Sequence, residues 1–258
     1  MKHIPRKRFG QHFLADKRVI ADIVAAVSIR PGEHVAEIGP GEGALTDLLI
    51  KQAAPLHVIE IDRDLAAALR LRFSPEQVVV HEGDALEFDY AWLPSPLRLV
   101  GNLPYNISTP LLFHLLNFAD RFTDMTFMLQ KEVVQRMVAA PSGPEYGRLS
   151  VMLQYRDEME MLLEVPPEAF RPPPKVDSAV VRLRPLPAEK LLACDAATLA
   201  RVVTAAFTQR RKTLRNALGK LMTEEGLRRI GINPGLRPEN LSVSDYVAIS
   251  NALIPQDR

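Results

Sequence analysis

Short apolar runs alternate with helical patterns through the first half of the chain, and this alternation restricts the fold more than any other feature. Five runs have the length and composition of strands: residues 34–39, 56–62, 77–82, 97–103 and 124–130. Each is followed by a helix or by a loop and then a helix, the clearest helices being residues 45–51, 65–73 and 109–118. Nearly continuous apolar strands in repeated strand–helix units predict a parallel sheet covered on both faces.

The pattern changes in the second half of the chain. Residues 159–165 and 178–184 predict two further strands, joined by residues 166–174, which hold five prolines. A late strand pair of this kind usually adds an antiparallel edge to a doubly wound sheet. After residues 185–187 the pattern is purely helical, and Ser242 with Asp245 forms the capping-box signal of a last helix. We therefore expect an α/β domain over residues 1–186 and a small helical domain over residues 187–258.

Positive charge is concentrated in two stretches, although the formal net charge of the chain is only +1. Residues 1–30 hold seven basic and two acidic side chains, and residues 201–229 hold eight basic and two acidic side chains. Such clusters on a nearly neutral protein favour a local anionic partner such as nucleic acid. Two solvated helix faces would give the same composition, so charge leaves both interpretations open.

Cysteine and histidine usage narrows the class of protein. The single cysteine, Cys194, is typical of a chain in a reducing cytosol, and no apolar run has the length of a membrane span. The six histidines are scattered without the spacing of metal ligands, so we expect no metal site.

A glycine-rich turn follows the first predicted strand. Gly39, Gly41 and Gly43 allow positive φ and a close approach of ligand to backbone, and the helix that follows favours an anionic group at its N-terminus. Glu60, at the end of the second strand, can accept hydrogen bonds from both ribose hydroxyls of an adenosine. The loop fits a nicotinamide dinucleotide as well as S-adenosylmethionine. Asp84, which can accept from an adenine amino group, slightly favours the adenosyl ligand.

Residues 101–108 (GNLPYNIS) follow the fourth predicted strand and belong at the mouth of the cofactor site, because ligands bind beyond the carboxyl ends of such strands. An adenine amino group is a poor nucleophile, since its lone pair is delocalised, and two acceptors for its N–H bonds would localise that pair. The Asn102 side-chain oxygen and the Leu103 carbonyl can supply both acceptors. Pro104 stiffens the turn, and Tyr105 offers a face for a base taken out of its stack. Catalysis then depends on positioning and electrostatics.

These residues lie in a sequence that closely resembles the ribosomal RNA adenine N6-dimethyltransferases, and within them the bacterial small-subunit enzymes whose loss confers kasugamycin resistance. The matching motifs span nearly the whole chain: residues 7–14 (KRFGQHFL), 37–41 (EIGPG), 60–62 (EID), 83–85 (GDA), 102–108 (NLPYNIS), 170–180 (FRPPPKVDSAV) and 209–216 (QRRKTLRN). The resemblance implies a Rossmann-like S-adenosylmethionine methyltransferase fold, with a seven-stranded mostly parallel sheet, an antiparallel edge strand and a helical C-terminal domain that binds RNA or the ribosome.

The resemblance also implies an activity and its residues. The activity is transfer of two methyl groups from S-adenosylmethionine to each of two adjacent adenines near the 3′ end of 16S rRNA, in an immature 30S subunit, by a cytoplasmic protein that we expect to be a monomer. The cofactor contacts expected from the matching motifs are Gln11, His12, Leu14, Glu37, Gly39, Gly41, Glu60, Ile61, Asp84, Ala85 and Asn102. The catalytic residues expected are Asn102, Leu103, Pro104, Tyr105 and Phe170, and the RNA contacts Arg8, Lys175, Arg210, Arg211, Lys212 and Arg215.

Several alternatives stay open at the level of single residues. His12 departs from the family, where Asn is more usual, and cofactor affinity would depend on pH if its side chain took part in binding. Phe170 is either a second wall for the flipped adenine, opposite Tyr105, or a core side chain at a strand end. The basic side chains after residue 209 either contact phosphates or form a solvated face.

Three other functions are consistent with parts of the sequence. A nicotinamide-dependent oxidoreductase accounts for the glycine loop but not for residues 102–105 or the basic helical domain. A methyltransferase that acts on large-subunit RNA, of the macrolide-resistance type, shares the catalytic motif, but residues 170–180 and 209–216 favour the small-subunit group. A non-enzymatic assembly factor would occupy the maturing subunit without needing Asn102.

Overall fold

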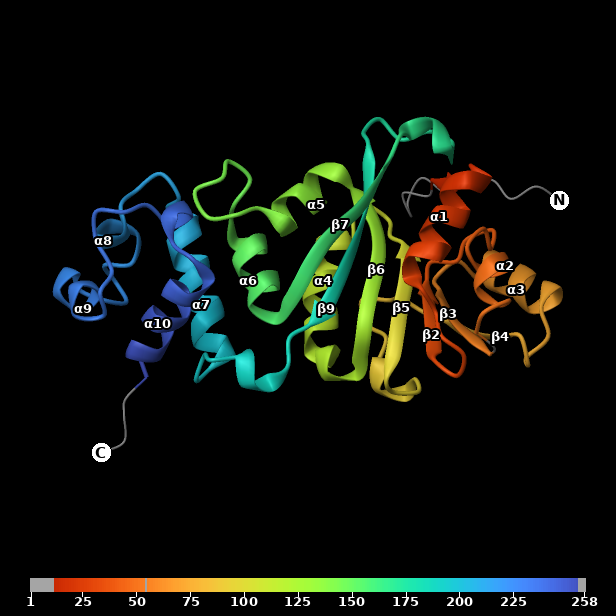
Figure 1. The fold of residues 1–258 in the computed structure, drawn as a ribbon, viewed down its shortest axis with the longest axis horizontal. Coiled ribbons are helices and arrows are strands. Elements are labelled where there is room, and N and C mark those ends of the chain that lie inside the picture. Colours follow the sequence, from red (N-terminus) through yellow and green to blue (C-terminus); the bar gives the residue numbers. More distant parts are fainter. Residues whose placement is uncertain (1–11, 54, 255–258) are drawn as a thin grey trace. The chain divides into compact units, whose positions relative to one another are not determined.

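The computed structural model describes residues 12–53 and 55–254. Its centre is a seven-stranded sheet with the strand order β4-β3-β2-β5-β6-β9-β7 (Figure 1). The strands are β2 (His34–Ile38), β3 (Leu56–Glu60), β4 (Val78–Glu82), β5 (Leu97–Asn102), β6 (Phe122–Gln130), β7 (Asp157–Val165) and β9 (Ser178–Pro185). The seven strands expected from the apolar runs are therefore confirmed, most of them to within two residues at each end.

The first five strands are parallel, and their pairing brings the ends of separate sequence segments together. β2 lies between β3 and β5, with Ile38 opposite both Ile59 and Gly101. β4 pairs parallel with β3, and β6 pairs parallel with β5, so the sheet extends on both sides of β2 with all five strands running in the same direction. The carboxyl ends of β2, β3, β4 and β5 thus lie along one edge, where the motifs of the glycine loop, Glu60, Asp84 and Asn102 follow their strands.

The predicted antiparallel part of the sheet is confirmed. β9 pairs antiparallel with β6 in the register Gln130 to Ser178, and β7 is hydrogen-bonded beyond it. A separate two-stranded sheet joins β1 (Phe13–Leu14) to β8 (Phe170–Arg171), with Leu14 opposite Phe170. This small sheet ties the segment that enters the first helix to the proline-rich connection between β7 and β9.

The described residues form two compact units: one holds residues 12–134, without residue 54, together with 159–185, and the other holds residues 135–158 and 186–254. The helices of the first unit are α1 (Lys17–Val27), α2 (Thr46–Leu49), α3 (Arg63–Arg72) and α4 (Ser108–Leu115), with 3-10 helices η2 (Tyr90–Trp92), η3 (Leu116–Arg121) and η4 (Pro167–Ala169). α5 (Lys131–Val138) crosses from the first unit into the second. None of the helices in the described residues is long and apolar enough to cross a membrane.

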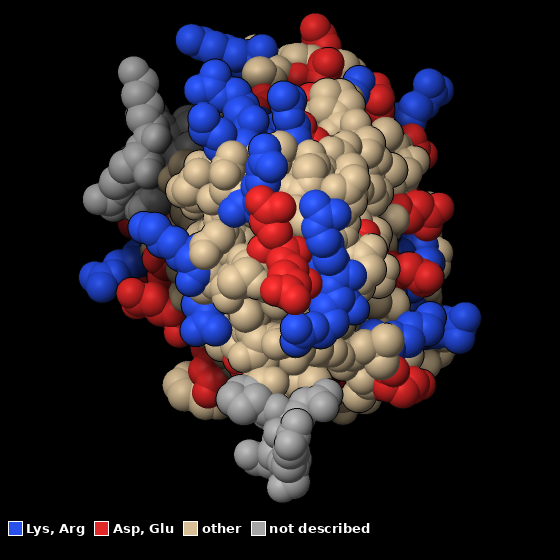
Figure 2. All heavy atoms as spheres, turned by 90° about the vertical axis from the view of Figure 1, so that its left-hand side faces the viewer, with Lys and Arg blue, Asp and Glu red and all other residues tan. Residues whose placement is uncertain are grey.

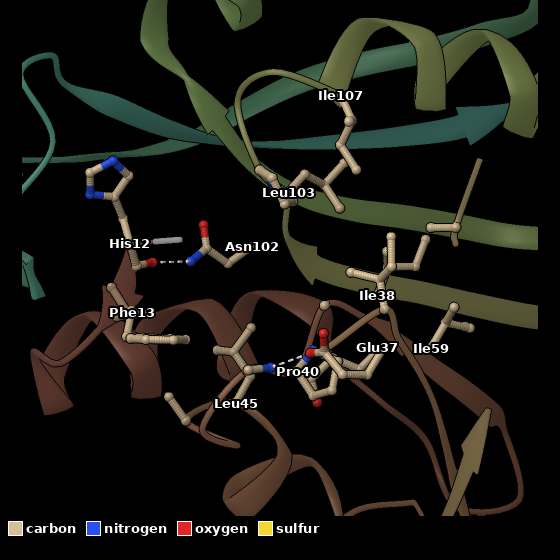
Figure 3. Close-up of a pocket in the computed structure, with 18 of the residues that line it drawn as sticks. His12, Phe13, Glu37, Ile38, Pro40, Leu45, Ile59, Asn102, Leu103 and Ile107 are labelled. Carbon is tan, nitrogen blue, oxygen red and sulfur yellow. Dashed lines mark hydrogen bonds between the residues drawn. The ribbon is translucent and has the colours of Figure 1, made fainter. Parts of the chain in front are cut away.

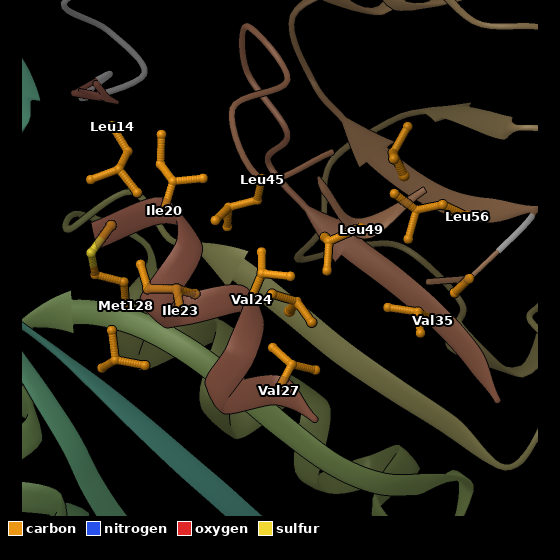
Figure 4. Close-up of a cluster of buried hydrophobic side chains, with 14 of the residues drawn as sticks. Leu14, Ile20, Ile23, Val24, Val27, Val35, Leu45, Leu49, Leu56 and Met128 are labelled. Atoms are coloured by element: carbon orange, nitrogen blue, oxygen red, sulfur yellow. The ribbon is translucent and has the colours of Figure 1, made fainter. Parts of the chain in front are cut away.

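The core of the first unit forms where α1 and α2 cover the sheet. Ile20, Ile23, Val24 and Val27 project from one side of α1 and pack in a cluster that includes Leu45, Leu49 and the strand residues Val35, Leu56 and Met128 (Figure 4). Their spacing along α1 follows the helical repeat, which is why the helix buries a single face. Asp16 caps the helix by accepting from the backbone N–H groups of Arg18 and Val19.

A buried ion cluster closes the opposite edge of the sheet, at the start of β5 and β6. Arg98 Nε lies 2.8 Å from a Glu33 carboxylate oxygen, and its Nη1 lies 2.8 Å from an Asp124 oxygen. The same Nη1 donates to the carbonyl of Val27 at the end of α1. Burial raises the pKa of Asp124 despite the guanidinium beside it. Arg98 thus connects the end of α1 to the start of β5 and β6.

The second unit is helical, and it differs from the expected domain of residues 187–258 by including residues 135–158. Its helices are α6 (Arg148–Arg156), α7 (Ala196–Thr208), α8 (Leu214–Ala217), α9 (Glu224–Arg229) and α10 (Val243–Ala252), with η5 (Ala188–Lys190) and η6 (Pro238–Asn240). Val151 and Tyr155 of α6 are buried in the same cluster as Leu199 and Val203 of α7. α6 therefore completes this core, although it lies between two sheet strands in sequence. The predicted capping box of the last helix is confirmed, with Ser242 and Asp245 bonded reciprocally.

Candidate active site

A cavity of about 300 Å³ opens at the carboxyl ends of β2, β3, β4 and β5, within the first unit (Figure 3). Its size falls at the lower end of small-molecule sites. Every cofactor residue expected from the sequence that lies in the described chain lines it: His12, Leu14, Glu37, Gly39, Gly41, Glu60, Ile61, Asp84, Ala85 and Asn102. Gln11 lies outside the described residues. The parallel register explains this convergence, because each motif follows the strand that carries it to the same edge.

The glycine loop after β2 has a backbone that other residues would strain. Gly39 and Gly41 have φ values of 67° and 58°, in the left-handed region. A Cβ atom on Gly41 would lie 3.0 Å from the ring of Phe13, which also lines the cavity. The Arg72 guanidinium holds the loop from outside through a 3.0 Å bond to the carbonyl of Glu42. The conformation of the loop is therefore held in place, and its backbone lines the cavity where it can contact a ligand.

Two carboxylates stand at the ends of β3 and β4. Glu60 is buried, and its oxygens accept from the backbone N–H groups of Gly41 at 3.1 Å and Asp62 at 2.8 Å. Asp84 accepts from the N–H of Leu86 at 2.9 Å. Each carboxylate oxygen has a second lone pair, so both groups can still accept from ribose hydroxyls or an adenine amino group. Ile61 follows Glu60 and lines the cavity with 43% of its surface exposed, which offers an apolar surface for the face of a base.

Glu37 has a different environment from Glu60 and Asp84. Its carboxyl group is 1% exposed and accepts a 2.6 Å hydrogen bond from the hydroxyl of Thr46. Burial raises the pKa of Glu37 to about 8, while the Thr46 bond opposes the shift and the nearby Glu60 adds to it. Near neutral pH the group is therefore mainly protonated in the absence of a cation. Glu37 can hold a proton or face a positively charged ligand group.

We expect this buried carboxyl to make stability depend on pH. The folded-state pKa lies above the ordinary value of 4.5, so the folded protein binds the extra proton, and this stabilisation is lost as pH rises from about 4.5 to about 8. Glu37→Gln should flatten the fall in the free energy of unfolding over this window, measured by denaturant titration without cofactor. The exposed Glu87→Gln is the matched control and should leave the profile unchanged. Equal slopes in wild type and Glu37→Gln would contradict the prediction.

Asn102 is held in one amide orientation. Its side-chain Nδ2 donates to the main-chain carbonyl of His12 at 3.0 Å, so its Oδ1 faces the other way, toward the side on which Leu103 lies (Figure 3). The backbone at Leu103 is fixed as well, because its N–H donates to the carbonyl of Met128 at 3.1 Å. Gly101 makes this close packing possible, since a Cβ there would lie 2.6 Å from the carbonyl of Ile38. The end of β5 therefore presents a preset hydrogen-bond acceptor to the cavity.

Tyr105 lines the cavity after the end of β5. Its hydroxyl is 2.6 Å from the hydroxyl of Ser178 at the start of β9, and burial raises its pKa. The ring is therefore anchored at its outer end. Pro104 and Asn106 line the cavity beside it.

The structure does not bring Phe170 to the cavity. Its side chain is 2% exposed and packs in the core cluster with Leu14 and Ala169. The interpretation of Phe170 as a second wall for the adenine is wrong here, because the β1–β8 pairing turns the side chain inward. Lys175 is exposed and does not line the cavity, and Arg8 lies outside the described residues.

Seven further apolar residues line the cavity, and the sequence did not single them out as ligand contacts. They are Phe13, Ile38, Pro40, Ala44, Leu45, Ile59 and Ile107. Most are neighbours of motif residues on a strand or loop, and their only signal was that position. Their apolar side chains look like ordinary core residues in sequence, so only the fold shows that they face a ligand.

The basic side chains of the second unit fall into two kinds. Arg210 is occupied within the unit, since it donates to the carbonyl of Pro144 at 2.6 Å and lies 3.6 Å from Glu239. Arg215 lies 3.8 Å from Glu224. Arg211 and Lys212 are exposed in the turn after α7 and, among the described residues, have no ion pair. Basic side chains are spread over a face of the protein, with acidic groups between them (Figure 2).

The fold and the cavity together define a class. A dinucleotide-binding sheet of the doubly wound type has six parallel strands, whereas this sheet has an antiparallel strand inserted between β6 and β7. With the glycine loop, two acids at neighbouring strand ends and an Asn-Leu-Pro-Tyr turn, the chain is a Rossmann-like methyltransferase of the S-adenosylmethionine-dependent class. Comparison with known families then narrows the class: residues 2–254 match the model of the ribosomal RNA adenine dimethylase family, and the chain belongs to that family.

Individual relatives agree with this assignment. The chain is 62% identical to the ribosomal RNA small subunit methyltransferase A of Aromatoleum aromaticum, over 97% of this chain and 94% of the relative. It is 59% identical to the protein of the same description from Thiobacillus denitrificans, over 96% and 97% of the two chains. Among solved structures, a dimethyladenosine transferase from Plasmodium falciparum superposes with a TM-score of 0.81 at 25% identity, over 92% and 96%. The 23S rRNA methyltransferase ErmE superposes with a TM-score of 0.72 at 30% identity, over 93% and 99%.

Proposed function

We propose that this protein dimethylates the N6 amino groups of two adjacent adenines near the 3′ end of 16S rRNA, in an immature 30S subunit in the cytoplasm. The observation that carries the proposal is the fixed orientation of Asn102, which presents an oxygen acceptor at the end of β5. The relatives named as small-subunit methyltransferases support the choice of RNA.

The cavity residues fit S-adenosylmethionine, which supplies a methyl group on a positively charged sulfur. In this proposal Glu60 accepts from the ribose and Asp84 from the adenine amino group, since both line the cavity, and the glycine loop allows close approach of the backbone. Glu37 adds a buried carboxyl group for the positive end of the ligand. The apolar side chains of Ile61 and Leu45 exclude water from the remaining faces.

The residues at the end of β5 then act on the target adenine. The Asn102 oxygen accepts one N–H of the amino group, and the Leu103 carbonyl accepts the other, so the nitrogen lone pair is directed out of the ring plane. Tyr105 supports the base by stacking. No strong general base is required, because the amino proton becomes acidic as the nitrogen gains positive charge. The protein therefore accelerates the reaction by orientation and preset electrostatics.

The test uses purified protein and methyl-labelled S-adenosylmethionine. The substrates are small subunits lacking dimethyladenine, normal small subunits and large subunits. We expect label in dimethyladenine only in the undermethylated small subunits. Label in large subunits would replace the proposal with the resistance-type activity, and absence of transfer to all three would contradict it. Retention of the biological effect by Asn102→Ala would instead favour a non-catalytic assembly role.

We also propose that Arg211 and Lys212 contact RNA phosphates. Their side chains are exposed and have no ion pair among the described residues, unlike Arg210. Arg211→Ala and Lys212→Ala should each weaken RNA binding most at low salt and reduce the slope of log K against log salt by about one. Lys190→Ala removes one charge from the same unit outside this turn and serves as the control. Filter binding at several salt concentrations makes the measurement, and unchanged slopes would exclude these contacts.

A further inference from the structure

The imidazole of His12 lies against the ring that is expected to receive the target base. The His12 and Tyr105 ring centroids are 5.8 Å apart, and their planes differ by 26°. Offset-stacked aromatic rings commonly have this separation. A third ring cannot enter between two rings at such a distance, so His12 and a stacked adenine exclude each other on this face of Tyr105.

His12 is also positioned with respect to the acceptor. Its main-chain carbonyl accepts from Asn102 Nδ2, and its ring projects to the side toward which Asn102 Oδ1 is directed (Figure 3). The target amino group has to reach that oxygen. The imidazole therefore occupies the approach of the base both at Tyr105 and at Asn102.

The two partners of this stack are held with unequal strength. Tyr105 is anchored through its hydroxyl to Ser178, which is buried in the sheet. The His12 side chain is half-buried, and its one hydrogen bond to the described residues runs from Nδ1 to the carbonyl of Pro172 at 2.8 Å, in an exposed setting. Rotation of the His12 side chain breaks this bond but leaves its backbone carbonyl on Asn102. The ring can move while the acceptor stays oriented.

We propose that the His12 imidazole is a gate of the target-base site: it covers Tyr105 while the site is empty, and the entering adenine displaces it. The proposal rests on the proposed function, since it takes the base to be an adenine extruded from RNA. The gate requires a base to compete with the imidazole for the face of Tyr105.

The kinetic test compares His12→Asn and His12→Ala with wild type on small subunits lacking dimethyladenine. We expect KM for the subunit to fall about 3- to 10-fold, the size expected from removal of one competing hydrogen-bonded group, and this fall should exceed any change in kcat or in the Kd of S-adenosylmethionine. His34→Asn, an exposed histidine at the opposite end of β2, is the control and should leave all three constants unchanged. A KM that stays the same or rises in both His12 variants would overturn the gate.

A second measurement tests the geometry without RNA. In protein labelled at histidine Cε1, the His12 resonance is assigned by its loss in His12→Asn. Stacking on Tyr105 should shift this resonance upfield, and Tyr105→Leu should return it toward the position of an exposed histidine. An unshifted resonance in wild type would overturn the stacked state. Failure of wild type to methylate any subunit would count against the proposed function, and the spectrum would still decide whether the ring covers Tyr105.

Discussion

Asn102→Ala is expected to lower kcat by about 10²- to 10³-fold, the loss typical of removing one preset electrostatic group from an active site. The substitution removes the oxygen that accepts from the target amino group and leaves the glycine loop and Glu60 in place. The affinity for S-adenosylmethionine should therefore fall less than it does in Glu60→Ala. Single-turnover transfer of labelled methyl groups and calorimetric cofactor binding measure the two effects separately.

Glu60→Ala gives the contrasting result. Glu60 accepts two backbone bonds that shape the cofactor loop, so its loss should weaken S-adenosylmethionine binding far more than the Asn102 substitution does. Asn117→Ala, at an exposed position in the same unit, is the matched control for Asn102→Ala and should behave as wild type. Equal losses of cofactor affinity in the Asn102 and Glu60 variants would contradict the separation of roles.

Arg98→Met is expected to reduce the free energy of unfolding by about 3–5 kcal/mol, because it leaves a buried carboxylate without its partner. Asp124 has 6% of its side chain exposed and lies 2.8 Å from the guanidinium. The methionine retains most of the side-chain volume, so the loss reports charge pairing and the bond to the end of α1 rather than a cavity. Urea denaturation followed by circular dichroism gives the free energy.

The pH dependence of this loss provides a further check. Burial already raises the pKa of Asp124, and removing the guanidinium that lowers it should raise that pKa more. Ionisation of Asp124 as pH rises then destabilises the folded variant, so the loss in the free energy of unfolding should be larger at pH 8 than at pH 5. Arg63→Met breaks an ion pair with Glu82 in which the arginine is 87% exposed, and it should change stability little. Similar losses in both variants would contradict the burial argument.

The sheet could be predicted from sequence because its signals are local. Each apolar run is long enough for one strand, and the glycine and proline turns between the runs punctuate them. The domain limits were harder to predict. Residues 135–158 interrupt the strands in sequence, and only the packing of Val151 and Tyr155 on α7 shows that they belong to the helical core.

Part of the site could also be predicted from local sequence signals. Glu60, Asp84 and Asn102 each end a strand, and the rule that parallel strands end at one edge is enough to bring them together. The same rule could not predict the direction of the side chains in the proline-rich segment. Phe170 pairs through its backbone with Leu14, more than 150 residues away in the chain, and that long-range pairing decided which way its side chain points.

The sequence by itself determined which chemical groups follow one another along the chain and which element carries each of them. These groups are a glycine turn, two acids and an Asn-Leu-Pro-Tyr turn. Local propensity and hydrophobic periodicity are sufficient for that, since they act over a few residues. The tertiary structure alone decided the orientation of the Asn102 amide, the inward turn of Phe170 and the stacking of His12 on Tyr105. These depend on contacts between segments distant in sequence, and no local pattern encodes which of two faces such a side chain will take.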